Sequence, residues 1–272
     1  MAIHATAVID SRAEVHPSCN IGPYVVIDGS VRIGPDCSLG PSVIVVGNTE
    51  LGPGCFIHAH VVIGDVPQDR KFLGFSSSCR VGEGCVIREG VTIHRASIEG
   101  QATVVGDRCY LMTNSHVAHD CVLENEVTLV SGALLGGHVH IGRKAIISGN
   151  VGIHQFVRIG ELAMIGGVAM ISQDVPPFTM TDHQGTVVGL NSVGLVRDGV
   201  SSADRDEIKT LFRIIYRSGM PYRRAVQLAS ELAVTNSGKR FAEFFRAESR
   251  RGVCRSRDRG TSSAIPEQPG ME

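Results

Sequence analysis

Two histidines and an aspartate lie close together in the middle of the chain. His116 and His119 are three residues apart, and Asp120 follows directly. An imidazole with a pKa near neutrality can take a proton from a hydroxyl nucleophile, and a neighbouring carboxylate can fix the orientation of the ring. These three residues therefore predict a general base with an orienting partner.

Two other interpretations of this cluster stay open. The spacing His116-x-x-His119-Asp120 could supply ligands to a metal ion, but side chains three residues apart on a strand point to opposite faces. We therefore expect no metal site. The histidines could also lie at exposed corners of the fold without a chemical role.

The elements that must position these residues repeat every six residues. Counted in steps of six from Ile3 to Ile171, 26 of 29 positions are Ile, Leu or Val, and the exceptions are Asp69, Phe75 and Glu99. Such self-similarity at a fixed period is an internal repeat. Glycine often follows the aliphatic residue, and glycine adopts the backbone angles that a sharp corner needs.

The six-residue period predicts a parallel β-helix. It fits neither an α-helix nor a long strand, but it fits short strands that alternate with corners, about 18 residues to a coil. Successive coils would stack about 4.8 Å apart with the aliphatic residues inside. Seven of the eight cysteines lie four residues after a position of this six-residue series. We therefore expect them to be small, buried, reduced thiols rather than disulfides or zinc ligands.

On coils of this length the other histidines form a row. The step from His119 to His138 and the step from His138 to His154 are each close to one coil in length. The three histidines should therefore lie on neighbouring coils along one edge. His94 belongs to the same half of the repeat. About one coil from His119, the segment Gly136-Gly137-His138 could present an unobstructed backbone N–H to a developing oxyanion.

The repeat also predicts the domain organisation. We expect a parallel β-helix over residues 1–180, with loops at 64–80 and 95–104 that leave the coil and return in register. Loops on a repeat scaffold often carry function. The end of the repeat is followed by an irregular, Gly-rich stretch. Helical spacing then predicts a small α-helical domain within 181–254, which would also cap one end of the solenoid.

Composition argues against several classes of protein. Hydrophobic residues make up 43% of the chain and the formal net charge is −1, which argues against a disordered chain and against nucleic acid as a partner. No segment reaches the roughly 18 apolar residues that cross a bilayer, and we find no secretion signal. We expect a cytoplasmic protein whose polar tail, residues 255–272, is disordered.

Several motifs, in this order, resemble one family of enzymes. Besides the six-residue repeat they are Gln-Asp-Arg-Lys-Phe at 68–72, Thr-Ile-His-Arg at 92–95, Asn-Ser-His-Val-Ala-His-Asp at 114–120, Gly-Gly-His-Val at 136–139, His-Gln-Phe at 154–156, Gln-Asp-Val-Pro-Pro at 173–177 and Ile-Tyr-Arg-Ser-Gly at 215–219. Over roughly residues 1–250 the chain is similar to the UDP-N-acetylglucosamine O-acyltransferases of lipid A synthesis.

The resemblance implies a left-handed parallel β-helix that forms a homotrimer with active sites between subunits. It implies transfer of a 3-hydroxyacyl chain from acyl carrier protein to the 3-hydroxyl of UDP-N-acetylglucosamine, with no metal or other cofactor. His119 would be the general base, Asp120 its partner, and the Gly137 N–H the oxyanion donor. The resemblance assigns Gly167 to the position that sets acyl-chain length and implies substrate contacts from Asp69, Lys71, His94, His116, His138, His154, Gln155, Asn191 and Arg197.

The chain departs from the family pattern at two positions. The family usually has an acidic residue at the position of Val193 and a basic residue at that of Asp198, where they help to hold the nucleotide. The acceptor could therefore instead be a 3-amino UDP-sugar, which would give an amide. The chain could also be another hexapeptide acyltransferase, or a non-enzymatic solenoid of the carbonic-anhydrase-like or scaffold type.

Basic residues of the helical domain, such as Arg217, Arg223 and Arg246, could attract an acidic carrier protein or could form an ordinary solvated surface.

Overall fold

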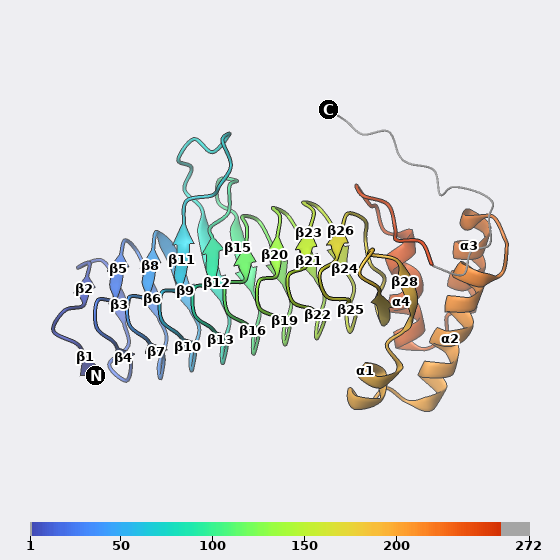
Figure 1. Ribbon diagram of the computed structural model, residues 1–272, viewed down its shortest axis with the longest axis horizontal. Helices are drawn as coiled ribbons and strands as arrows, with labels where there is room; N and C mark the ends of the chain where they lie inside the picture. Colours follow the sequence, from blue (N-terminus) through green and yellow to red (C-terminus); the bar gives the residue numbers. More distant parts are fainter. Residues whose placement is uncertain (1, 257–272) are drawn as a thin grey trace.

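The computed structural model describes residues 2–256, which form a three-sided solenoid of short strands followed by helices (Figure 1). In each coil the chain passes through three sheets in turn, so strands that are consecutive in sequence lie in different sheets. Strands that pair within a sheet run parallel, except for the last pair, β27 with β28.

The first sheet contains β1 (Ala2–Ile3), β4 (Asn20–Ile21), β7 (Ser38–Leu39), β10 (Phe56–Ile57), β13 (Val86–Ile87), β16 (Tyr110–Leu111), β19 (Thr128–Leu129), β22 (Ile146–Ile147), β25 (Met164–Ile165), β27 (Thr179–Thr181) and β28 (Val187–Leu190). The second contains β2 (Val8–Ile9), β5 (Val26–Asp28), β8 (Ile44–Val46), β11 (Val62–Asp65), β14 (Thr92–His94), β17 (His116–Val117), β20 (Leu134–Leu135), β23 (Gly152–Ile153) and β26 (Met170–Ile171). The third contains β3 (Glu14–Val15), β6 (Arg32–Ile33), β9 (Asn48–Leu51), β12 (Ser78–Val81), β15 (Ala102–Val105), β18 (Val122–Leu123), β21 (His140–Ile141) and β24 (Arg158–Ile159).

The aliphatic residues of the six-residue repeat fill the inside of the solenoid. Successive side chains of a strand leave opposite faces, and from Ile21 to Ile171 every aliphatic member of the series is at most 4% exposed. The cysteines are free and buried, as predicted. The Cys19 thiol, for example, donates a hydrogen bond to the Gly34 carbonyl of the next coil, 3.2 Å away.

Two loops project from one edge of the solenoid without disturbing the ladder (Figure 1). In the early coils Val15 pairs with Ile33, its equivalent one coil further along the chain. Leu51 pairs with Val81, and Val81 pairs with Val105, although a loop lies between the partners in both cases. Each loop lengthens its coil by a whole number of six-residue repeats, so the inward-facing series stays in phase across it.

The bounds expected for the two loops were wrong, and so was the expectation for the stretch after the repeat. The loops occupy 66–77 and 95–101 and are shorter than expected, because β11, β12 and β15 extend into the predicted loop regions. The stretch after the repeat is not irregular. It contains β27 and β28, which extend the first sheet, and a short helix, α1 (Ser192–Arg197). These elements lack the six-residue period, so the repeat could not reveal them.

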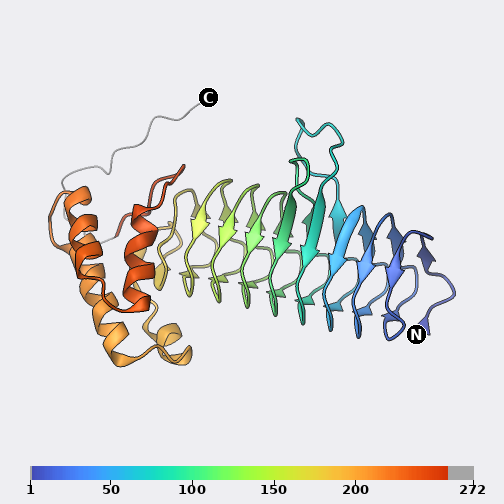
Figure 2. The same cartoon turned by 180° about the vertical axis from the view of Figure 1, so that it is seen from behind.

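Three longer helices follow: α2 (Ser202–Arg217), α3 (Tyr222–Leu232) and α4 (Asn236–Arg246). They lie beside the last coils (Figure 2). A partly buried ion pair fixes the segment that follows the last coil, because the Arg158 Nε donates to Asp174 Oδ2 at 2.7 Å and the Asp174 side chain is fully buried. Within residues 2–256, none of the helices combines the length and the apolar character needed to cross a membrane.

The predicted tail is partly ordered. The Val187 N–H donates to the Arg255 carbonyl at 2.9 Å, and Val187 also forms a β-bridge with Ser256. Residues 257–272 lie outside the described part of the chain, so disorder there stays a prediction.

Candidate active site

The predicted cluster lies where the chain passes from the second sheet to the third. We call this the histidine edge; it comprises residues 118–121, 136–139 and 154–157 of successive coils and the loops 66–77 and 95–101. Both loops project from it in Figure 1. The edge therefore brings together segments that are far apart in the sequence.

His119 and Asp120 form a hydrogen-bonded pair at this edge. His119 Nδ1 lies 2.7 Å from Asp120 Oδ2, and the two side chains are only 14% and 7% exposed. Burial raises the pKa of the Asp120 carboxyl, but hydrogen bonds from His119 and from Ser97 outweigh burial and lower that pKa to about 2. Asp120 is therefore ionised near neutral pH, and an anion there favours the tautomer of His119 that carries its proton on Nδ1.

Two hydroxyl groups hold Asp120 in place. Ser97, in the loop 95–101, donates from Oγ to Asp120 Oδ2 at 2.6 Å and from its backbone N–H to both carboxylate oxygens at 3.1 and 3.2 Å. Thr103 Oγ1 accepts the Asp120 backbone N–H at 2.8 Å. Neither residue was expected from the sequence, because nothing in the repeat links them to the cluster.

Asp120 also begins a column of side chains that occupy equivalent corners. Asp120, His138 and Phe156 follow one another at intervals of one coil and have φ values of 58°, 60° and 66°. His138 Nε2 lies 3.7 Å from Asp120 Oδ2, and the rings of His138 and Phe156 stack with centroids 4.5 Å apart. Phe156 could have been predicted from the sequence, because it lies one coil after His138, but the expected row contained histidines alone.

His138 is surrounded by charges of both signs. Burial lowers its pKa most, His119 and Arg250 lower it further, and the carboxylates of Asp120 and Asp69 oppose the decrease. The guanidinium carbon of Arg250 lies 4.7 Å from the centre of the Phe156 ring that stacks on His138. Arg250, from the segment after α4, therefore reaches the histidine edge.

Two further predicted histidines lie beside the pair. The rings of His94 and His116 meet edge to face with centroids 5.1 Å apart, and Thr92 Oγ1 is 2.7 Å from His116 Nδ1. Burial, together with the charges of His94 and His119, lowers the pKa of His116 to about 4. Burial also lowers the pKa of His94, whose buried Nδ1 has no hydrogen-bond partner among the described residues. Both rings are therefore neutral near pH 7.

Gly137 leaves the space that the His119 imidazole occupies. A Cβ atom at position 137 would lie 2.7 Å from His119 Nε2 and 2.5 Å from Cε1. Real Cβ atoms do not approach other atoms so closely, so a side chain here would displace the imidazole. Within residues 2–256 the Gly137 N–H donates no backbone hydrogen bond, whereas its neighbour His138 donates to the His119 carbonyl.

The remaining predicted residues divide into two groups. Asp69 accepts the Lys71 backbone N–H at 2.9 Å in the loop 66–77, and its charge acts on His138. His154 and Gln155 are exposed at the next corner of the same edge. These four therefore belong to the histidine edge.

Asn191, Arg197 and Gly167 lie elsewhere in the same chain. Asn191 caps α1, where its side chain accepts the Gly194 N–H at 2.9 Å and donates to the Leu162 carbonyl at 2.9 Å. In Figures 1 and 2, α1 and the projecting loops lie at opposite edges of the solenoid. Gly167 lies between β25 and β26, at the edge where the first sheet passes to the second.

Asp198, one of the two departures from the family pattern, anchors α1. Its carboxylate pairs with Arg143 Nη2 at 2.8 Å and with the Lys144 ammonium, and its side chain is 10% exposed. Arg143 and Lys144 lie between β21 and β22, at the edge where the third sheet passes to the first. The acidic residue therefore has a structural role that the sequence did not predict.

The histidine edge also presents a possible set of metal ligands. One atom each from His119, Asp120 and His138 lies within 4.8 Å of the others. This set differs from the spacing considered from sequence, which used His116. Two of the three, His119 and Asp120, are expected to act as base and partner and the third, His138, to contact substrate, so a metal ion here would compete with those roles.

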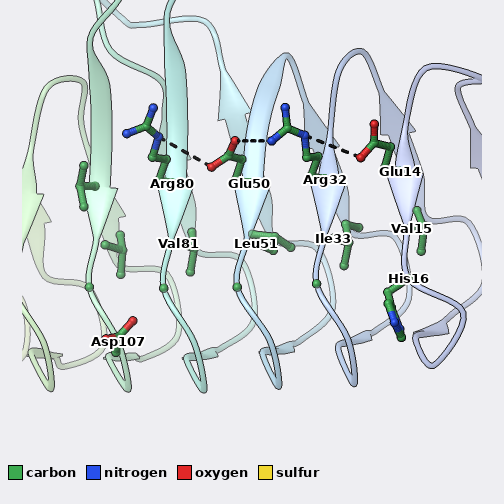
Figure 3. A pocket seen from close by; sticks show the side chains of 16 residues that line it. Glu14, Val15, His16, Arg32, Ile33, Glu50, Leu51, Arg80, Val81 and Asp107 are labelled. Atoms are coloured by element: carbon green, nitrogen blue, oxygen red, sulfur yellow. Dashed lines mark hydrogen bonds and ion pairs between the residues drawn. The ribbon is translucent and has the colours of Figure 1, made fainter.

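A shallow groove of about 650 Å³ lies away from this edge, along the third sheet (Figure 3). Its wall carries a ladder of alternating charges, in which Arg32 Nη1 lies 3.1 Å from Glu50 Oε1 and Arg80 Nε lies 3.8 Å from Glu50 Oε2. The charged side chains of this ladder form ion pairs with one another. None of the residues of the His119 cluster lines the groove.

Comparisons with known proteins agree with the fold. Residues 30–65 match the family profile "Bacterial transferase hexapeptide (six repeats)", and residues 174–254 match "Udp N-acetylglucosamine O-acyltransferase; Domain 2". An acyl-[acyl-carrier-protein]–UDP-N-acetylglucosamine O-acyltransferase of Alkalilimnicola ehrlichii is 46% identical over 255 residues, which are 93% of this chain and 99% of that protein. The enzyme of the same name from Synechocystis sp. is 49% identical over 167 residues, and there the match spans 61% of this chain and only 60% of the relative's length.

Solved structures give the same result. The UDP-N-acetylglucosamine acyltransferase of Francisella novicida superimposes with a TM-score of 0.90 at 34% identity, over 94% of this chain and 95% of that one. The repeating parallel coils and the hexapeptide match define a hexapeptide-repeat transferase. Within that class, the chain belongs to the UDP-N-acetylglucosamine O-acyltransferase family, which confirms the resemblance seen in the sequence.

Proposed function

We propose that this chain transfers a 3-hydroxyacyl chain from acyl carrier protein to the 3-hydroxyl of UDP-N-acetylglucosamine, the first step of lipid A synthesis. The observation that supports it most directly is the 2.7 Å contact of His119 Nδ1 with the ionised Asp120 carboxylate. It leaves Nε2 as the free basic atom, beside the open space at Gly137.

His119 acts as the general base. Its Nε2 accepts the proton of the sugar hydroxyl while the hydroxyl oxygen attacks the thioester carbonyl carbon. Asp120 accepts the Nδ1–H and stabilises the imidazolium that forms. The rings of His94 and His116 are neutral, so they are weaker proton donors than the His119 imidazolium. They instead help to position the acceptor.

The Gly137 N–H donates to the oxyanion of the tetrahedral intermediate. Preorganised backbone donors of this kind are worth about 10²- to 10³-fold in turnover. Collapse of the intermediate breaks the carbon–sulfur bond, and the leaving thiolate takes the proton from the His119 imidazolium. The products are the ester and the free thiol of the carrier, and His119 returns to its neutral form.

The active form is proposed to be a homotrimer of left-handed β-helices, with each site between two subunits. The supporting observation is that Asn191, Arg197 and Gly167 lie at edges other than the histidine edge of the same chain. One chain alone therefore does not bring the nucleotide-binding and chain-length residues to His119. Neighbouring subunits with facing edges would do so.

Roles of the other residues follow from their positions. Asp69, Lys71, His138, His154 and Gln155 line the sugar-nucleotide and acyl sites from the histidine edge. Asn191 and Arg197 contact the nucleotide from the facing subunit. We also propose that the β-helix domain extends over 1–180 and the helical domain over 181–254.

An acyl-transfer assay tests this function. UDP-N-acetylglucosamine and its 3-amino analogue are offered with acyl carrier protein donors of several chain lengths. We expect the hydroxyl acceptor to be used and His119→Ala to abolish turnover. Preference for the amino acceptor would assign the alternative substrate, and undiminished turnover of His119→Ala would refute the mechanism.

A second measurement separates this enzyme from a zinc-dependent solenoid. Protein freed of metal by a chelator is expected to keep full acyl-transfer activity, because His119, Asp120 and His138 act as proton-handling and binding groups. Added Zn²⁺ should inhibit, since those residues can act as ligands. Activity that is lost with the chelator and restored by Zn²⁺ would contradict the proposal.

A further inference from the structure

We propose that Ser97 is a positioning residue for catalysis: it holds the Asp120 carboxylate in the rotamer that orients His119. This inference rests on the proposed function of His119 as base. It adds a residue that lies outside the histidine row and outside the sequence motifs at 92–95 and 114–120.

The His119–Asp120 pair needs an external contact to fix its geometry. The two residues are sequence neighbours at a corner, and Asp120 adopts φ of 58°. The Asp120 side chain must turn back toward its own neighbour to reach Nδ1. A short carboxylate with two χ angles has other rotamers available, so something outside the pair has to select the one observed.

Ser97 makes the contacts that select this rotamer. It donates three hydrogen bonds to the carboxylate, and its hydroxyl uses Oδ2, the same oxygen that contacts His119. Hydrogen bonds to an ionised acceptor are stronger than those between neutral groups. The Thr103 hydroxyl fixes the Asp120 backbone N–H at the same time, so both ends of the residue are held.

The loop 95–101 delivers Ser97 to this position. It occurs where the chain inserts one additional six-residue unit between two coils. Ser77 Oγ donates to the Ala96 carbonyl at 2.5 Å, and the Ala96 N–H donates to the Ser78 carbonyl at 3.1 Å. The residue before Ser97 is therefore clamped to the solenoid, and the loop presents Ser97 to the His119–Asp120 pair as a fixed donor.

The experiment compares Ser97→Ala with Ser97→Thr in the full chain. Ser97→Ala removes the hydroxyl but keeps the backbone donor. We expect kcat to fall about 10- to 100-fold, the usual effect of losing an outer partner of a functional histidine. KM for the UDP-sugar should change less than about twofold, because the Ser97 hydroxyl is already bonded to Asp120. Ser97→Thr keeps a hydroxyl on Cβ and should restore most of kcat.

Ser77→Ala is the matched control for the loop. It removes another serine hydroxyl that anchors the same segment but does not touch Asp120. The Ala96 N–H still donates to the Ser78 carbonyl in this variant, so Ser97 should stay in place and kcat should fall less than in Ser97→Ala. An equal loss of kcat would show that only the fold of the loop matters and would overturn the proposal. Thermal unfolding of both variants reports any general loss of structure.

A double-mutant cycle with Asp120→Asn gives the decisive measurement. If Ser97 acts through Asp120, then adding Ser97→Ala to Asp120→Asn should cost less than about threefold further in kcat. Multiplicative losses would overturn the inference. Full activity of both His119→Ala and Asp120→Asn would instead refute the proposed mechanism, so the two failures can be distinguished.

Discussion

Asp120 contacts His119, its own neighbour in the chain, through a 2.7 Å hydrogen bond between Oδ2 and Nδ1. On a strand these side chains would leave opposite faces. They meet here because Asp120 occupies a corner in the left-handed backbone region, with φ of 58°. Aspartate is among the few residues other than glycine that tolerate this region, so one residue forms the turn and also supplies the hydrogen-bond partner of His119.

Gly137→Ala is predicted to inactivate the enzyme. The new methyl group would lie 2.5 to 3.1 Å from three atoms of the His119 imidazole, so the ring must move away from Asp120. We expect turnover to fall at least about 10²-fold, as for loss of general base assistance. Gly189→Ala, where a Cβ meets nothing within 4 Å, is the control and should keep normal activity. Normal turnover of Gly137→Ala would show that the His119 ring does not depend on the space at position 137.

Acid should destabilise the protein through His116. Burial lowers the folded-state pKa of His116 from 6.5 to about 4, so between these values the unfolded chain binds more protons. The free energy of unfolding should therefore decrease as pH falls from about 6.5 to about 4 and be insensitive to this group below that range. The loss is on the order of 3 kcal/mol.

His116→Gln removes this titration and should flatten the dependence, measured by urea unfolding at several pH values. Burial also lowers the pKa values of His94 and His138. These two groups therefore make unfolding easier at low pH as well, and the free energy of unfolding of His116→Gln should still depend on pH in part. An identical slope in His116→Gln and the unaltered chain would argue against the burial of this imidazole.

Asp198→Ala should destabilise the chain by about 1–2 kcal/mol. It leaves Arg143 and Lys144 without their shared anion, and breaking a fully buried pair costs about 3–5 kcal/mol. The smaller figure reflects the exposure of the two basic side chains, 36% and 30%. Asp198→Asn, which keeps the size and part of the hydrogen bonding, should lie between. Equal stability of all three proteins in urea unfolding would mean that the ion pairs do not hold α1.

Gly167→Met should shift donor preference toward shorter acyl chains. The glycine is exposed, its φ is not in the left-handed region, and a Cβ there would approach no atom closer than 3.7 Å. The backbone therefore accepts a side chain, and the methionine would fill space that a long chain needs. Competition between carrier-bound donors of different length measures the shift, with Gly167→Ala as the smaller control. Unchanged preference in both variants would place the length-determining contact elsewhere.

The repeat made most of the solenoid predictable. Its aliphatic residues face inward because the period of six places them on one side of every short strand, and this holds from Ile21 to Ile171. The proximity of His119 and His138 was predictable for the same reason, since about one coil separates them. The stretch that contains β28 and α1 has no such period, and it was wrongly expected to be irregular.

Further features of the site depend on contacts that no spacing encodes. Ser97 reaches Asp120 only because a loop folds back onto the solenoid, and the distance along the chain between the two residues is not a multiple of the repeat. Arg250 reaches Phe156 from the segment after the last helix. Asp198 differs from the family pattern in sequence, and only its partners explain why an acidic residue is suitable there.

The ladder of the first coils has a consequence for how such a chain changes in length. Each strand pairs in register with the strand one coil before it and one coil after it, as β4 does with β1 and β7. Excision of one whole coil ahead of the first loop would bring the flanking coils together with the same pairing. The coils that carry Ser97, His119 and His138 would be untouched. The solenoid is thus modular. Whole early coils could be removed or added without changing the coils that carry Ser97, His119 and His138.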